Sequence, residues 1–433
     1  MLPTPRELQP VLEQALHAGA AAASVHIVHR EARRGQLEPA QRPRLTQQTN
    51  HTAVVKVWLK DGQQAEASGP RDSLPALFKR AISAAEGAPS RPFAGPWERP
   101  SLPARGLGIH DVRHAQITDD DRIEVLTSSE AAARKIDPTL QLRHVRWTDT
   151  REHRVFANTR GLGCSERGTT YQLDVAVFQP AHKLLLTDRF EGRSFADVSC
   201  LPFAADVARR LRQLSGPEAA GEGAMPVLIP PRPMSRLIDW IADQVAGGPP
   251  DGLLRTRRAE PLFHRRIHII DDGLASGGLR TRGFDDDGVS PMPITVVREG
   301  HVQQPYLDVI TARESGADPT GHLFEGALRP SNLQLHSGNR SIHASLSDVG
   351  GTIFEVDDLP DLSGINPKTG QLRLPVRGRI FQGQEAQGPV REAWLTGNLA
   401  DALSRVITVA SDTDRLLHVD APGIFVEGLT VER

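Results

Sequence analysis

The segment that most resembles a chemical site is GGLRTRGFDDDGV, residues 277–289, which places three consecutive aspartates among four glycines. A helix–loop–helix calcium site needs acids at alternate positions and a late bidentate glutamate, and this segment has neither. Adjacent side chains of an extended chain point to opposite sides, so Asp285, Asp286 and Asp287 cannot all reach one ion. A phosphate cradle is also excluded, because no Gly-Lys-Ser/Thr and no helix start follow the glycines. The pattern predicts a solvated turn with glycine at positive φ, and a functional surface is the alternative.

Other residues able to bind metals or attack substrates are sparse. His264 and His268 have the i, i+4 spacing of two zinc ligands on a helix, but their segment is predicted to be a strand. On a strand these positions lie about 13 Å apart, and the glutamate that serves zinc peptidases as general base is missing. The two cysteines, Cys164 and Cys200, cannot form a four-thiolate site, and no Gly-x-Ser-x-Gly motif occurs. The residues alone therefore predict a chain without catalytic chemistry of its own.

The elements that must position these residues form an N-terminal α/β half made of two similar subdomains. Apolar periodicity predicts helices at residues 7–17 and 73–85, one beginning at Thr118, and one at 204–214. Alternating patterns predict strands at residues 24–29, 52–59, 144–147, 154–158 and 170–178. Turns are expected at Gly161 and Gly168. A proline-rich stretch, residues 88–105, is predicted to connect the two subdomains.

The C-terminal half is predicted to be rich in β-structure. A small, polar, Gly-rich stretch at residues 217–223 suits a linker, so the expected domains are residues 1–216 and 224–433. A strand at 227–229 and a helix at 235–245 are followed by many short strands separated by glycine and proline. Because helices mix with mostly antiparallel strands and no regular βαβ alternation appears, the predicted fold class is α+β.

Composition narrows the range of partners and compartments. The formal net charge is -2 and the isoelectric point is about 6.8, so no general attraction to nucleic acid or to anionic membranes is expected. No apolar run reaches the roughly 20 residues of a membrane span, and no signal peptide is visible. The chain is expected to be cytoplasmic, with free thiols.

Several segments, in sequence and in their order along the chain, resemble those of the TldD/PmbA family of peptidases, and within it the PmbA (TldE) branch. The specific segments are IIDDGLASGGLRTRGFDDDGVSPMPITVVREG, ALRPSNLQL, INPKTGQL and PVREAWLTGNLADAL. A looser likeness covers VWLKDGQQAEASGP and FANTRGLGCSERGTTYQLDVAVF in the N-terminal half. The resemblance therefore extends over nearly the whole chain.

The resemblance implies a peptidase complex in which this chain is not the catalytic part. The TldD branch binds zinc through a His-Glu-x-x-x-His helix and a distant C-terminal cysteine. Here the matching helix reads SRLIDWI from Ser235, and no cysteine follows Cys200. The expectation is a chain with no cofactor, paired as a heterodimer with a zinc-bearing TldD-like subunit that acts on unfolded or leader peptides. The alternative is a stand-alone homodimeric scaffold or peptide-binding protein; the family's label as a modulator of DNA gyrase fits the neutral charge poorly.

By the same resemblance, the glycine-rich loop is expected to form the wall of a shared peptide chamber or a subunit contact. The family's usual sequence for this loop is GGLGSSPFDDEG, whereas this chain has GGLRTRGFDDDG, with the additional arginines Arg280 and Arg282. These arginines would favour acidic peptides if the loop contacts the substrate. Replacing Asp285 and Asp286 together by alanine is expected to impair assembly or turnover more than folding. The candidate residues of this chamber or interface are Gly277, Gly278, Phe284, Asp285, Asp286, Gly288, Asn332, Asn366 and Asn398.

Overall fold

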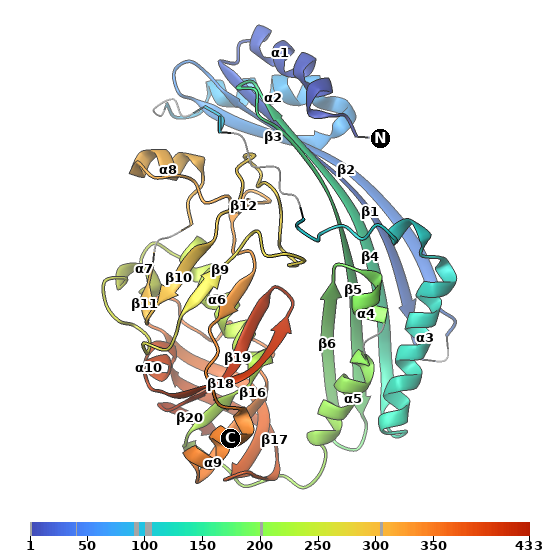
Figure 1. Cartoon of the computed structure of the whole chain (residues 1–433), viewed down its shortest axis with the longest axis vertical. Helices are drawn as coiled ribbons and strands as arrows, with labels where there is room; N and C mark the ends of the chain where they lie inside the picture. Colours follow the sequence, from blue (N-terminus) through green and yellow to red (C-terminus); the bar gives the residue numbers. More distant parts are fainter. Residues whose placement is uncertain (1, 40, 91–94, 100–105, 200–201, 304–305) are drawn as a thin grey trace.

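The computed structural model describes residues 2–39, 41–90, 95–99, 106–199, 202–303 and 306–433. A long, curved sheet from the N-terminal half lies beside a more compact, β-rich C-terminal part (Figure 1). The expected connection at residues 88–105 lies partly outside the described residues, and so does Cys200. Helices mix with largely antiparallel sheets, and the predicted α+β class is confirmed.

The N-terminal sheet has six antiparallel strands in the order β3-β2-β1-β4-β5-β6. Its strands are β1 (Ala22–Leu37), β2 (Arg44–Trp58), β3 (Gln64–Pro70), β4 (Gln141–Asn158), β5 (Gly163–Gln179) and β6 (Leu184–Gly192). Its helices are α1 (Gln9–His17), α2 (Leu74–Glu86), α3 (Asp119–Ile136), α4 (Phe195–Ser199) and α5 (Phe203–Gln213). The order of one helix, three strands and a closing helical segment thus occurs twice, and β1 and β4 meet in the middle of the sheet.

The strands are much longer than the sequence pattern predicted. The segments expected at 144–147 and 154–158 are the two ends of the single strand β4, and the expected turn at Gly168 lies inside β5. The turn at Gly161 is confirmed, because this residue joins β4 to β5 with a φ of 85°. Apolar residues mark only part of each strand; the remaining part is polar and carries no periodic hydrophobic signal.

Two helix layers cover the two ends of the curved sheet. One apolar cluster joins α1 and α2 to β1 and β2, and a second joins α3 and α5 to β4 and β5. The start predicted for α3 is confirmed, because Thr118 and Asp121 form a capping box that satisfies free N–H groups of its first turn.

A buried ion pair fixes α3 to β4. The Arg122 guanidinium donates to both Asp149 carboxylate oxygens, at 2.6 and 3.0 Å, and the Trp147 indole N–H donates to the same group at 2.8 Å. Burial alone would raise the pKa of Asp149, but these bonds and that of His114 hold its pKa at about 2. The contact therefore orients the middle of β4, which borders the spaces described below.

The C-terminal part is built on a twelve-stranded, mostly antiparallel sheet around the largest apolar cluster of the protein. Its strands are β7 (Gly223–Ala224), β8 (Val227–Ile229), β9 (Ile269–Asp271), β10 (Ile294–Arg298), β11 (His301–Val302), β14 (Leu333–Leu335), β15 (Thr352–Asp358), β16 (Gln371–Gln382), β17 (Glu385–Asn398), β18 (Val406–Leu416), β19 (Val419–Val426) and β20 (Leu429–Glu432). A separate pair consists of β12 (Leu323–Phe324) and β13 (Ala327–Leu328).

The helices of this part are α6 (Pro231–Gly247), α7 (Leu253–Thr256), α8 (Val309–Ser315), α9 (Ile342–Val349) and α10 (Leu399–Ser404). Helix α6 contains the predicted helix 235–245 and begins at a proline, which suits a first turn whose N–H groups have no intrahelical partner. Its apolar side packs on β18 and β19. Within the residues that the structure describes, none of the helices has the length and apolar content needed to span a bilayer.

Candidate functional site

The loop of residues 277–289 folds around a buried aspartate. The Asp285 side chain is 1% exposed, and its carboxylate accepts the N–H groups of Asp287, Val289 and Leu323 at 2.9, 3.0 and 3.2 Å. Burial and the nearby charge of Asp287 raise the pKa of Asp285 to about 8, against the opposing effect of these donors. Asp285 is therefore a structural acceptor at the centre of the loop.

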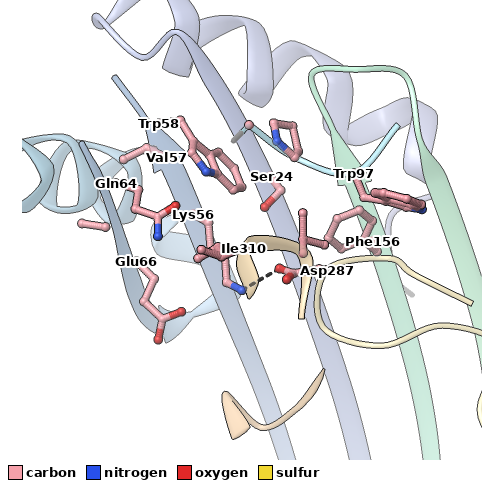
Figure 2. A pocket seen from close by; sticks show the side chains of 14 residues that line it. Ser24, Lys56, Val57, Trp58, Gln64, Glu66, Trp97, Phe156, Asp287 and Ile310 are labelled. Carbon is pink, nitrogen blue, oxygen red and sulfur yellow. Dashed lines mark hydrogen bonds and ion pairs between the residues drawn. The ribbon is translucent and has the colours of Figure 1, made fainter. Parts of the chain in front are cut away.

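The next two aspartates reach across to the N-terminal sheet. Asp286 lies 3.5 Å from the Arg154 guanidinium and 3.4 Å from the His26 ring, while Asp287 accepts the Lys56 ammonium at 2.6 Å (Figure 2). The prediction of a solvated loop is wrong, because the loop fills the junction between the two parts of the protein. The expectation that replacing Asp285 and Asp286 by alanine spares folding assumed that these acids are exposed, and that assumption is wrong because Asp285 is buried and Asp286 is largely so.

A mixed polar and apolar cavity of about 280 Å³ adjoins this junction. Figure 2 shows aromatic rings from Trp58, Trp97 and Phe156 around it, with the Lys56–Asp287 ion pair at one side. The sequence analysis missed this cavity, since its walls come from many segments spread along the chain between Ser24 and Ile310.

Two glycines of the loop are required by close packing. Gly288 has a φ of 79°, and a Cβ atom there would lie 2.5 Å from the Phe156 ring. A Cβ atom on Gly278 would lie 2.5 Å from Oδ1 of Asn332. That oxygen accepts the N–H of Arg280, and Nδ2 of Asn332 donates to the carbonyl of Asp272, so the asparagine fixes the start of the loop.

The structure divides the nine candidate residues into two groups. The residues gathered at the loop are Gly277, Gly278, Phe284, Asp285, Asp286, Gly288 and Asn332. Asn398 instead caps α10 and donates to the carbonyl of Thr369, while Asn366 accepts N–H groups of the same turn. Asn366 and Asn398 therefore belong to a separate turn, and the structure does not bring them together with the loop. A chamber or interface role for either group stays a prediction.

The histidine pair of the sequence analysis lies in a turn before β9, so its assignment to a strand is wrong. The His268 ring packs on His336 with 4.3 Å between centroids, and the His264 ring accepts an N–H from Arg266. Across the described ranges, no three His, Cys, Asp or Glu side chains are grouped as metal ligands.

A second space, here called the α6 cleft, lies between α6 and the edge of the N-terminal sheet. Its volume is about 500 Å³. It is lined by Asp174, Thr187, Asp188, Arg189, Ser235, Arg236, Asp239, Trp240, Asp243, Leu362, Leu416, Leu417, His418 and Val419. The cleft is thus walled by the N-terminal sheet on one side and by α6 with the β18–β19 turn on the other.

Three positions of α6 test whether this cleft could hold zinc. If His-Glu-x-x-x-His is laid on the helix from Ser235, its two histidines and its glutamate correspond to Ser235, Trp240 and Arg236. All three residues line the cleft, but the Ser235 hydroxyl donates to the Pro231 carbonyl and the Arg236 guanidinium donates to that of Leu359. A hydroxyl, an indole and a guanidinium do not form the imidazole and carboxylate set of a zinc peptidase, so the residues present do not fit the ion.

Two aspartates of α6, Asp239 and Asp243, face the α6 cleft beside His418. Asp239 lies 2.8 Å from the His418 ring; burial would raise the pKa of Asp239, but this bond lowers it overall. Burial and the charge of Asp239 raise the pKa of Asp243, one helical turn further on. Sequence reasoning missed His418, because it comes from the β18–β19 turn and nothing near it in the chain signals the contact.

Two domain models of one protein family match this sequence. The PmbA/TldA metallopeptidase central domain matches residues 113–214, and the PmbA/TldA metallopeptidase C-terminal domain matches residues 222–433. Metalloprotease PmbA of Escherichia coli O157:H7 is 22% identical over 73% of this chain and 71% of that protein. The Metalloprotease PmbA homolog of Haemophilus influenzae is 22% identical over 88% of this chain and 86% of that protein.

Solved structures share the fold over almost the full length. A protein from Thermotoga maritima, described as a proposed modulator of a DNA gyrase, superposes with a TM-score of 0.84 at 22% identity and covers 98% of both chains. TldE from Thermococcus kodakarensis gives a TM-score of 0.81 at 14% identity, over 98% of this chain and all of its own. With two family domains matched in sequence and the whole fold shared, this chain belongs to the PmbA/TldD family of metallopeptidase-like proteins.

Proposed function

We propose that this chain is the noncatalytic, zinc-free subunit of a heteromeric TldD-type metallopeptidase that acts on unfolded or leader peptides. In this proposal the metal, the general base and the cleavage step belong to a TldD-like partner. The chain itself contributes walls of the space in which peptides are held.

One observation carries the proposal. The face of α6 on which the family's zinc motif would stand opens into a cleft of about 500 Å³, yet it presents Ser235, Arg236 and Trp240. A zinc peptidase site needs three protein ligands and an open position, with a base that activates water. The space beside the helix is present, while the residue types for hydrolysis are not.

Reconstitution with a zinc-bearing TldD-like chain tests the proposal. The three samples are this chain alone, the partner alone and the two together, each measured for bound zinc, for mass in solution and for cleavage of an unstructured peptide. We expect less than about 0.1 zinc per chain in the first sample and chelator-sensitive cleavage that is strongest in the third. About one zinc per isolated chain, or chelator-insensitive cleavage by it, would contradict the proposal.

The open cleft also supports a second function, peptide binding by a stand-alone homodimer. A groove of this size with ionised groups on its walls is able to hold an extended peptide without cutting it. Measuring the mass in solution distinguishes the two functions. A stable heterodimer favours the peptidase subunit, and a homodimer that does not associate with the zinc-bearing chain favours the peptide-binding protein.

A further inference from the structure

A third space is enclosed by the polar face of the long central strands. Register places Arg30 opposite Glu152, and Thr150 opposite both Ala32 and Thr170. Since alternate residues of a strand share a face, one side of three neighbouring strands contributes to the same wall. This cavity of about 310 Å³, here called the arginine cavity, is lined by Arg30, Ala32, Arg34, Ile109, Thr148, Thr150, Glu152, Arg154, Glu166, Gly168, Thr170, Arg193, Leu279, Thr281 and Arg282.

The positive charges of the arginine cavity outnumber its negative charges. Five of the lining residues are arginines and two are glutamates. Both glutamates are already engaged, because Glu152 pairs with Arg30 at 2.7 Å and Glu166 pairs with Arg154 at 2.8 Å. The other arginines of the lining therefore face the cavity without a carboxylate of their own there.

The first of these uncompensated groups is Arg193. Its guanidinium donates to the backbone carbonyls of Gly278, Thr169 and Leu279 at 3.0, 3.1 and 2.6 Å, and these acceptors are neutral. Burial and the nearby charge of Arg282 lower the pKa of Arg193 to about 10. The bonds fix the direction of the side chain and leave its charge uncancelled.

The second is Arg282, which lies in the glycine-rich loop 277–289. It is half-buried and stacks on the Phe324 ring at 4.7 Å. Among the described residues, no carboxylate forms an ion pair or a hydrogen bond with it. Burial and the charge of Arg154 lower the pKa of Arg282, against the opposing charges of Glu152, Glu166 and Asp286 at longer range. A buried charge is costly unless it is paired, so an anion placed here gains the most from this guanidinium.

Hydroxyl groups complete the lining. Thr148, Thr150 and Thr170 are half-buried, and in the described part of the chain their hydroxyls form no hydrogen bond with another protein group. Each hydroxyl is a donor that can turn toward an oxygen atom. Guanidinium and hydroxyl donors around one space favour an anion with several oxygens, and charge-assisted bonds of this kind are the stronger ones.

We propose that the arginine cavity binds the carboxylate of an acidic peptide, with Arg282 as its principal partner and Thr150 and Thr170 as supporting donors. A planar guanidinium that forms no ion pair with a carboxylate among the described residues can bind a ligand carboxylate through two parallel N–H···O bonds. That the carboxylate comes from a peptide rests on the proposed function. Anion binding by the cavity does not rest on it.

Binding of a labelled, unstructured glutamate-containing peptide to the full chain tests the proposal. We expect Arg282→Gln to weaken binding by about tenfold or more and Thr150→Val to weaken it by about threefold. Arg280→Gln is the matched control, because it removes the same charge from the same loop outside the arginine cavity, and it should stay within about twofold of the natural chain. Melting curves establish that each variant is folded.

Three further ligands identify the source of the anion. A peptide with glutamine in place of glutamate should bind weakly, and amidating the C-terminus of the acidic peptide should change little. Inorganic phosphate should raise the melting temperature less than the acidic peptide does. Equal binding of the glutamate and glutamine peptides, equal binding by a folded Arg282→Gln variant, or protection by phosphate with no peptide binding would each overturn the proposal.

The acidic-peptide site and the proposed function can be supported or contradicted independently of each other. Chelator-sensitive cleavage of a neutral peptide by the reconstituted pair, with no dependence on Arg282, would leave the proposed function standing and remove the acidic-peptide site. If the chain binds the acidic peptide through Arg282 but does not associate with the zinc-bearing partner, the acidic-peptide site would be supported and the proposed function contradicted.

Discussion

The loop 277–289 and the α6 cleft differ in how their sequence relates to their surroundings. The loop carries three consecutive acids, and Asp285, Asp286 and Asp287 all find partners within the protein. The segment of α6 contains nothing that suggests a site on its own, yet its side chains border about 500 Å³ of open space. Clustered charge therefore joins the two parts of the fold, and the open space lies over a helix with no sequence motif of its own.

The largest effect that tests this contrast is expected from Asp285→Ala. The substitution leaves three N–H groups without an acceptor, two of them buried, so the free energy of unfolding should fall by about 3 kcal/mol or more. Denaturant titration measures it. Asp318→Ala is the control, since Asp318 is exposed, forms only a surface pair with Arg99, and should cost less than about 1 kcal/mol. If Asp285→Ala has near-normal stability, Asp285 is not needed for folding, and the loop would then be interpreted as a functional surface.

A smaller effect is expected where the loop meets the N-terminal sheet. Lys56 and Asp287 are 22% and 14% exposed, so removing either partner leaves a partly buried charge. Lys56→Met and Asp287→Asn should each cost about 2 kcal/mol, and the double variant should cost clearly less than the two together. A double-mutant cycle by thermal and chemical unfolding gives the coupling energy. Strict additivity would show that this pair does not hold the two parts together.

The smallest effect is expected in the α6 cleft. Asp239 is 32% exposed and contacts His418 and, at 3.9 Å, Arg280, so Asp239→Asn should cost less than about 1 kcal/mol at pH 7. The pKa of Asp239 is lowered in the folded state, so its stabilisation is present above the unfolded pKa of about 3.9 and is lost as pH falls through the folded value. The free energies of unfolding of the natural chain and of Asp239→Asn should therefore converge as the pH falls below about 4. A difference that grows in acid would contradict this sign.

Sequence patterns predicted best where one side of an element is apolar. The strand 227–229 is confirmed at the same bounds, and the helix 235–245 lies inside α6, because both pack on the C-terminal core. The start of α3 was readable from Thr118 and the acids after it, since capping depends on local bonds alone. The family and the α+β class followed from segment order.

The polar halves of the long strands could not be predicted in the same way. Residues 44–52 of β2 are almost all exposed, and the segment TDTREH in β4 faces a polar cavity, so neither shows apolar alternation. The burial of Asp285 was missed for a related reason, because its donors include the N–H of Leu323 from a distant turn. What the sequence analysis lacked in each case was the identity of the residues packed opposite.

The pairing of β1 with β4 has a consequence for how the chain is made. These strands lie side by side in the centre of the sheet, yet the residues they pair are more than a hundred positions apart in the chain. During synthesis β1 and β2 emerge first and are able to form a hairpin, while the other edge of β1 keeps its N–H and C=O groups unpaired until β4 leaves the ribosome. At the usual pace of translation that interval is on the order of ten seconds. A nascent chain stalled after α2 therefore presents a long strand edge to its neighbours, and aggregation should concentrate in fragments that end before residue 141.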